Sequence, residues 1–179
     1  MTLPQIVALD GHDAAGKTTL AHALADKLGG VYRRPFHGSL GAELLRAGER
    51  GDFDRVIAIG EEGIGTALEA AGECKPIVLD RSWMTVASLI QPELLSMFFA
   101  RWQRWIPTAL CWADLPTTVR RLEHRTEPEQ TIATHQQYLA KYLKIAKHSA
   151  SPVIRTDLYS EQSCLEFLLK WINDSTRKE

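Results

Sequence analysis

The chain has 179 residues, with 21 Lys or Arg against 22 Asp or Glu, so its formal net charge is −1. This near-neutral balance gives no global electrostatic basis for binding nucleic acid or a membrane surface, although it does not exclude local contacts with nucleic acid. The length suits one compact domain with a real core, and we therefore expect a single domain over residues 1–179.

The N-terminal residues, the length of the apolar runs and the cysteines predict a cytoplasmic protein. The first apolar segment begins within a few residues of Met1, which leaves no room for a secretory leader, and no apolar run is long enough to span a bilayer. Cys74, Cys111 and Cys164 are widely spaced and form no metal pattern, so we expect reduced thiols. The six histidines also lack a ligand spacing.

Short apolar runs alternate with helical patterns along the chain. Strands are expected at Ile6–Asp10, Val31–Arg33, Pro76–Asp80, Thr108–Ala113 and Pro152–Arg155. Helices are expected at Thr18–Leu28, Leu40–Ala47, Phe53–Ala71, Thr85–Trp105, Thr117–Arg125, Thr131–His148 and Gln162–Asn173, with Pro92 breaking or kinking the fourth. This alternation predicts an α/β fold with a mostly parallel sheet and helices on both faces.

Directly after the first expected strand, residues 11–19 read G-H-D-A-A-G-K-T-T, a complete G-x-x-x-x-G-K-[ST] phosphate-binding loop. The glycines allow a close backbone approach, and successive amides with the following helix N-terminus attract phosphate oxygens. Lys17 is expected to neutralise the β- and γ-phosphates, and the Thr18 hydroxyl to ligate Mg²⁺. The residues expected to bind the nucleotide cofactor are Gly11, Ala14, Ala15, Gly16, Lys17, Thr18 and Thr19.

A second candidate site follows the third expected strand, at Asp80 and Arg81. An acid at the end of a parallel strand, beside a phosphate loop, is placed to hold Mg²⁺ directly or through water. Arg81 can then clamp a phosphate with two hydrogen bonds. The alternative is an Asp that caps the next helix and an Arg that pairs with it.

Two further arginine clusters are candidates. Arg121 and Arg125 share a helix face near a short lid expected around residues 120–131, where they can stabilise charge that develops during transfer. The alternative is a solvated helix face. Arg33, followed by Pro35 and Phe36, is expected to lie across the cleft and hold an acceptor phosphate, or else to be a surface arginine.

Asp13 and Trp83 complete the set of candidates. Asp13, inside the phosphate loop, is placed to position the acceptor or to stabilise the loop through a local hydrogen bond. Trp83 follows the Asp80 motif and is placed either to stack on a base or to pack in the core, which is the more common fate of a large aromatic side chain.

These sites, in this order, resemble the thymidylate kinase family of nucleoside monophosphate kinases. Residues 11–19 follow the family loop G-x-D-G-A-G-K-[ST]-T, including its acid at Asp13, and residues 33–35 match its R-x-P motif for the acceptor phosphate. Residues 80–82 match its D-R-[YS] motif, and the segment 115–125 resembles the approach to its lid. The resemblance implies a P-loop kinase fold with a five-stranded parallel sheet, and direct transfer from ATP·Mg²⁺ to a nucleotide.

The base-reading positions depart from that family. About twenty residues before Asp80, where the family carries an aromatic residue and an arginine for thymine, the chain reads V-I-A-I-G-E-E. The tyrosine of D-R-Y is Ser82, and Val86 and Leu89 stand where the family has polar residues. Because a site built to hydrogen-bond one base discriminates strongly, these replacements predict altered base specificity.

The leading hypothesis is therefore an ATP- and Mg²⁺-dependent kinase that acts on a nucleoside monophosphate or a close analogue. One alternative is a kinase that phosphorylates a hydroxyl on a nucleoside or on a modified base in DNA. Another is a non-catalytic nucleotide-binding switch. The family is often dimeric, and the helical segments 53–71 and 85–105 can supply an interface or simply belong to the core.

Overall fold

The computed structural model describes residues 5–71, 75–123 and 130–176. Its sheet has five parallel strands in the order β2-β3-β1-β4-β5. Their bounds are β1 (Ile6–Asp10), β2 (Val31–Arg33), β3 (Ile77–Asp80), β4 (Thr108–Trp112) and β5 (Val153–Arg155). The predicted α/β class with a parallel sheet is confirmed, and the strand order 2-3-1 places the first strand in the middle of the sheet.

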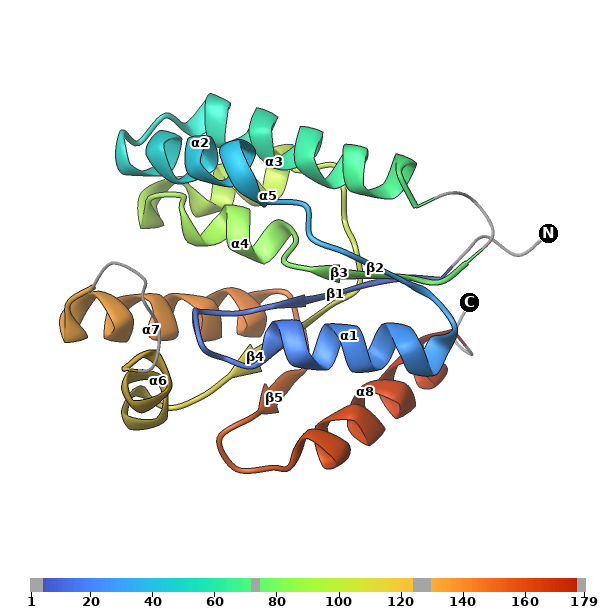
Figure 1. The fold of residues 1–179 in the computed structure, drawn as a ribbon. Coiled ribbons are helices and arrows are strands. Elements are labelled where there is room, and N and C mark those ends of the chain that lie inside the picture. The colour runs from blue at the N-terminus through green and yellow to red at the C-terminus, as the bar shows by residue number, and fades with distance from the viewer. Residues whose placement is uncertain (1–4, 72–74, 124–129, 177–179) are drawn as a thin grey trace.

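Helices cover both faces of this sheet (Figure 1). Their bounds are α1 (Lys17–Leu28), α2 (Gly38–Glu49), α3 (Phe53–Glu69), α4 (Trp83–Ser88), η1 (Pro92–Leu94), α5 (Leu95–Arg101), α6 (Leu115–Leu122), α7 (Ile132–His148) and α8 (Glu161–Thr176). Helices α1 and α8 lie on one face, and α2 to α5 lie on the other with α7. Within the described ranges, no helix has both the length and the apolar character needed to cross a membrane.

The two covered faces of the sheet explain why the strands β1 and β3 are apolar up to their final aspartate. Side chains of a strand alternate between the faces, and here both faces are buried. Val7 and Leu9 of β1 pack with α1 and α8, whereas Ala8 packs on the opposite side with Ile77 and Leu79 of β3. The core therefore has two halves separated by the sheet. Polar side chains such as Asp10 and Asp80 lie at the edge where the strands end.

One predicted helix differs from the structure. Residues 85–105 do not form a single helix but α4, η1 and α5. Helix α4 starts earlier than expected, at Trp83, because the buried Asp10 carboxylate accepts hydrogen bonds from the amides of Met84 and Thr85. Pro92 then occupies the first position of η1, where its missing amide hydrogen costs nothing.

Candidate active site

The phosphate loop joins the central strand β1 to α1 at the carboxyl edge of the sheet. Gly11 has φ +143°, and a Cβ built there would lie 2.1 Å from the Cys111 carbonyl oxygen of β4. Gly16 caps α1 with φ +80°, in the left-handed region that favours glycine. Both glycines of the motif are therefore required by backbone geometry and not only by pattern.

The side chain of Lys17 turns back onto the phosphate loop. It is buried, and Nζ donates a 2.7 Å hydrogen bond to the His12 carbonyl oxygen. Burial and the nearby Arg81 charge together lower the Lys17 pKa to about 8, although Asp13 and Asp80 oppose the shift. In the free protein, Lys17 therefore loses its proton more easily than a surface lysine does. An anion bound in the loop stabilises the charged form.

The structure brings Thr18 of α1 and Asp80 of β3 into contact. Thr18 Oγ1 donates to Asp80 Oδ2 at 2.6 Å, while Asp80 Oδ1 is buried without a hydrogen-bond partner among the described residues. A carboxylate oxygen with no donor, beside a hydroxyl oxygen, fits the oxygen-ligand chemistry of Mg²⁺. No group of three or more His, Cys, Asp or Glu side chains able to hold a metal occurs in the described part of the chain.

Asp13 and Arg81 form an ion pair at the mouth of the loop. Arg81 Nη2 donates to Asp13 Oδ1 at 2.6 Å, and Nη1 reaches the Gly11 carbonyl at 3.5 Å. Although burial opposes ionisation, Arg81 and Lys17 hold the pKa of the Asp13 carboxyl below its usual range. Arg81 itself has φ +80°, an unfavourable angle for a residue with a Cβ, so the backbone accepts strain to direct this side chain.

A cavity of about 320 Å³ opens beside Asp13 and Arg81, between the loop, α2, α4 and α7. Its other lining residues include Arg34, Phe36, His37, Leu44, Ser88, Tyr138 and Tyr142. Its volume lies at the small end of the range for ligand sites. We call this the acceptor-side cavity. Phe36 was predicted to be at this site and lines it.

Two residues predicted for this cavity do not reach it. Arg33 donates instead to the carbonyl oxygens of Tyr32 and Ala70, at 3.0 Å each, and it is Arg34 that lines the cavity. Arg33 is the last residue of β2 and Arg34 the first one after it, and a pattern of two adjacent arginines does not reveal which of them faces the cavity. Pro35 is buried and does not line the cavity either.

The predicted role of Trp83 in base stacking is also wrong. Its side chain is 2% exposed, and its indole nitrogen donates to the Ile106 carbonyl at 3.0 Å. Its ring packs edge-on against Trp105. Trp83 is therefore a core residue whose polar atom is satisfied internally, which is the second of the two interpretations of the sequence.

A second cavity, of about 540 Å³, opens on the opposite side of the loop beside Ala14, Gly16 and Thr19. We call it the donor-side cavity. Arg121 lines it and is anchored there, because its Nη1 donates to the Ala14 carbonyl at 3.0 Å and its Nη2 to the Thr156 carbonyl at 2.8 Å. Arg125 and most of the lid expected around 120–131 lie outside the described residues.

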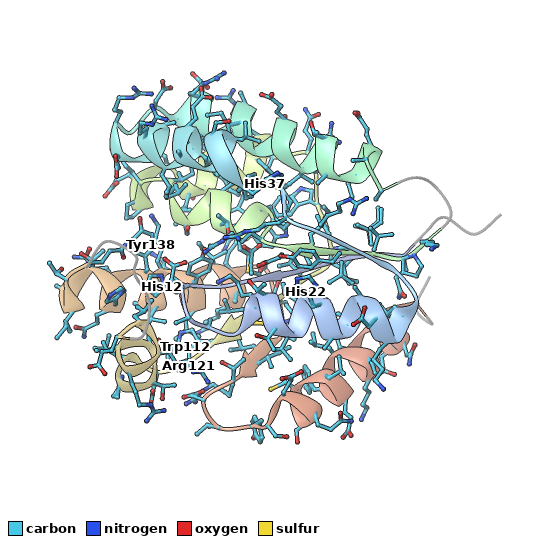
Figure 2. The ribbon with its side chains drawn as sticks, viewed as in Figure 1. His12, His22, His37, Trp112, Arg121 and Tyr138 are labelled. Atoms are coloured by element: carbon cyan, nitrogen blue, oxygen red, sulfur yellow. The ribbon has the colours of Figure 1, made fainter. Side chains whose placement is uncertain are left out.

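Sequence reasoning missed a pair of histidines that joins the loop to α7. The buried His12 places Nε2 at 2.8 Å from His135 Nδ1, and its ring stacks on Tyr138 with 5.4 Å between centroids. Figure 2 shows His12 and Tyr138 close together at this edge of the molecule. Burial lowers the His12 pKa to about 4. The two histidines are 123 residues apart, so no local pattern predicts their contact.

The chain was compared with known proteins, and its fold is similar to folds already solved. No protein-family model matches the sequence, and no curated protein matches it. Among solved structures, a thymidylate kinase from Candida albicans superposes with a TM-score of 0.70 at 14% identity, covering 100% of this chain and 96% of that one. The chain has the thymidylate kinase-like P-loop fold.

Two other structures support the same assignment of the fold. Deoxyadenosine kinase from M. mycoides with bound dATP gives a TM-score of 0.67 at 14% identity, covering 94% of this chain and 100% of that one. Thymidylate kinase from Ehrlichia chaffeensis gives a TM-score of 0.60 at 19% identity, covering 94% and 98%. Identities this low establish the thymidylate kinase-like fold alone, so the choice of acceptor depends on the residues of this chain.

Proposed function

We propose that the protein transfers the γ-phosphoryl group of ATP, with Mg²⁺, to the phosphate of a nucleoside monophosphate or a close analogue. The observation that carries this proposal is the position of the phosphate loop between two cavities. Asp13 lines the acceptor-side cavity, whereas Ala14 and Gly16 line the donor-side cavity. Two ligands that meet at this loop would meet at their phosphates.

On the donor side, the loop amides and Lys17 hold the β- and γ-phosphates, and the base of ATP occupies the donor-side cavity. Arg121 is suited to contact that base, since two of its nitrogens are occupied by backbone carbonyls while its planar group remains in the cavity wall. Thr18 and Asp80 are the residues that would hold Mg²⁺, which supplies charge neutralisation for the transferring group.

On the acceptor side, the charges favour an anion. Among the residues that the structure describes, Arg34 and Arg81 line the cavity, and Asp13 is its one carboxylate. An oxygen of the acceptor phosphate forms the new bond to the γ-phosphorus as the bond to the β–γ bridging oxygen breaks, and ADP leaves with that electron pair. A phosphate oxygen carries no proton that must be removed at neutral pH, so the reaction requires no general base.

The same geometry weighs against a hydroxyl acceptor. A hydroxyl would need a carboxylate free to accept its proton, and the only acid lining the acceptor-side cavity within the described residues is Asp13. Asp13 is already paired with Arg81, and its lowered pKa makes it a weaker base. Base specificity is proposed to differ from that of thymidylate kinases, because the polar side chains that α4 and α7 contribute to this cavity include Ser88, Tyr138 and Tyr142 rather than an arginine.

The test is ADP release in the presence of ATP and Mg²⁺ over a panel of nucleoside monophosphates, nucleosides and oligonucleotides. Turnover with one or more monophosphates and with no nucleoside is the expected result. Turnover only with nucleosides or oligonucleotides would replace the proposal with the hydroxyl kinase. Tight ATP binding with no turnover on any acceptor would replace it with a nucleotide-binding switch.

A further inference from the structure

Tyr32 is a residue of the edge strand β2 that no motif assigns, and it reaches the centre of the candidate site. It pairs in register with Val78 of β3, two residues before Asp80. Its ring lies on the α1 side of the sheet, where His22 of α1 stacks on it with 3.7 Å between ring centroids. Strand β2 thus places the ring against α1, with its hydroxyl within hydrogen-bond distance of Asp80.

The hydroxyl of Tyr32 bonds to the carboxylate already implicated in metal binding. It donates to Asp80 Oδ2 at 2.9 Å, and the same oxygen accepts the 2.6 Å hydrogen bond from Thr18. Both donors converge on one oxygen, while the other, Oδ1, is buried and receives no hydrogen bond among the described residues. Two donors on Oδ2 prevent the carboxylate from rotating and leave Oδ1 as the free acceptor.

This arrangement matches the way outer residues orient metal ligands. A ligating carboxylate is itself hydrogen-bonded as a rule, and those bonds set which oxygen is presented to the cation. The Thr18 hydroxyl donates its hydrogen to Asp80, so the lone pairs of its oxygen can bind the cation. Within the described residues, the side chain of Tyr32 hydrogen-bonds to Asp80 and stacks on His22, so its route to the metal site is through Asp80.

We propose that Tyr32 is a positioning residue for Mg²⁺, which acts by fixing the Asp80 carboxylate with Oδ1 turned toward the cation. The inference rests on the proposed function, since it assumes that nucleotide binds with Mg²⁺ at this loop. Strand β2 also leads directly into Arg34 of the acceptor-side cavity. The same edge strand therefore supports the metal carboxylate and carries an acceptor arginine.

The experiment measures the affinity for ADP by calorimetry, with and without Mg²⁺, in the wild type and in Tyr32→Phe. The ratio of the two affinities is the magnesium coupling, and it requires no turnover. Tyr32→Phe removes one oxygen and keeps the stacked ring. We expect it to lower the magnesium coupling about tenfold, while the affinity for metal-free ADP stays within about twofold of the wild type because the loop is unchanged.

A second variant separates the hydroxyl from the packing around it. His22→Ala removes the ring that stacks on Tyr32 but no donor to Asp80, so its magnesium coupling is expected to stay close to that of the wild type. Unchanged coupling in Tyr32→Phe would overturn the proposal. So would an equal loss in His22→Ala, or a loss in Tyr32→Phe that is the same without Mg²⁺. A wild type that binds ADP with no magnesium coupling would instead overturn the assignment of the metal site itself.

Discussion

The donor and acceptor halves of the candidate site are built in different ways. The donor half comes mostly from one contiguous stretch, residues 11–19, with Asp80 added from the neighbouring strand. The acceptor half is assembled from the phosphate loop, the segments after β2 and β3, and helices α2, α4 and α7. A contiguous stretch carries its geometry in its own backbone, whereas an assembled cavity depends on how several helices pack. The residues of the donor half can therefore be predicted from the sequence, whereas those of the acceptor half cannot.

The largest expected effect lies in the donor half. Lys17→Ala should lower kcat/KM for phosphoryl transfer by about 10³-fold, because it removes the charge that neutralises the transferring phosphates. Steady-state ADP release measures this loss. The control is Lys27→Ala, which changes an exposed lysine at the far end of the same helix and should leave activity unchanged. Equal activity in the Lys17 variant would mean that the loop does not hold the donor.

The next effect tests the acceptor half. Arg34→Ala should raise the KM for the acceptor by roughly 10- to 100-fold, the usual range for a lost hydrogen bond to a charged group. The KM for ATP should stay unchanged. Arg33→Ala is the matched control, since the Arg33 guanidinium donates to two backbone carbonyls away from the cavity. If the Arg33 variant shows the larger rise in acceptor KM, the observed assignment of the two arginines is reversed.

The pKa of Lys17 predicts a dependence on pH that belongs to the donor half alone. Phosphate binding favours the charged lysine, whose pKa in the free protein is about 8. The affinity for ATP should therefore be constant below pH 8 and fall as the pH rises through it, reaching about a tenfold loss by pH 9. Calorimetry across this range measures the fall. The Lys17→Ala variant should show a flat profile, and a wild type that is equally flat would contradict the lowered pKa.

The smallest expected effect on activity separates the core from the acceptor half. Trp83→Phe removes the indole donor to Ile106 and part of a buried ring, which should lower the free energy of unfolding by about 1–3 kcal/mol. The acceptor KM should not change, because Trp83 does not line the cavity. Thermal unfolding and steady-state kinetics measure the two quantities side by side. A raised acceptor KM with unchanged stability would restore Trp83 to the site.

Several features of the site followed from local sequence. The strand, loop and helix at 6–28 were predicted because an apolar run, the glycines of the loop motif and the helical pattern after them are all features of residues close together in the sequence. The proximity of Thr18 and Asp80 was also predicted, since parallel strands end at one edge of the sheet and β1 lies beside β3. The parallel register that pairs Leu9 with Asp80 delivers both groups to the same place.

What the sequence could not determine depends on contacts between distant segments. Which of Arg33 and Arg34 lines the cavity depends on how the chain leaves the edge strand. The burial of Trp83 depends on its contacts with Ile106 and Trp105. Tyr32 and His12 acquire roles only through Asp80 and His135, which are 48 and 123 residues away. The sequence alone determined a phosphate loop on a parallel α/β sheet, because its backbone angles and amide directions are local. The tertiary structure decided which side chains surround that loop, because burial and hydrogen-bond partners are set only when the helices pack on the sheet.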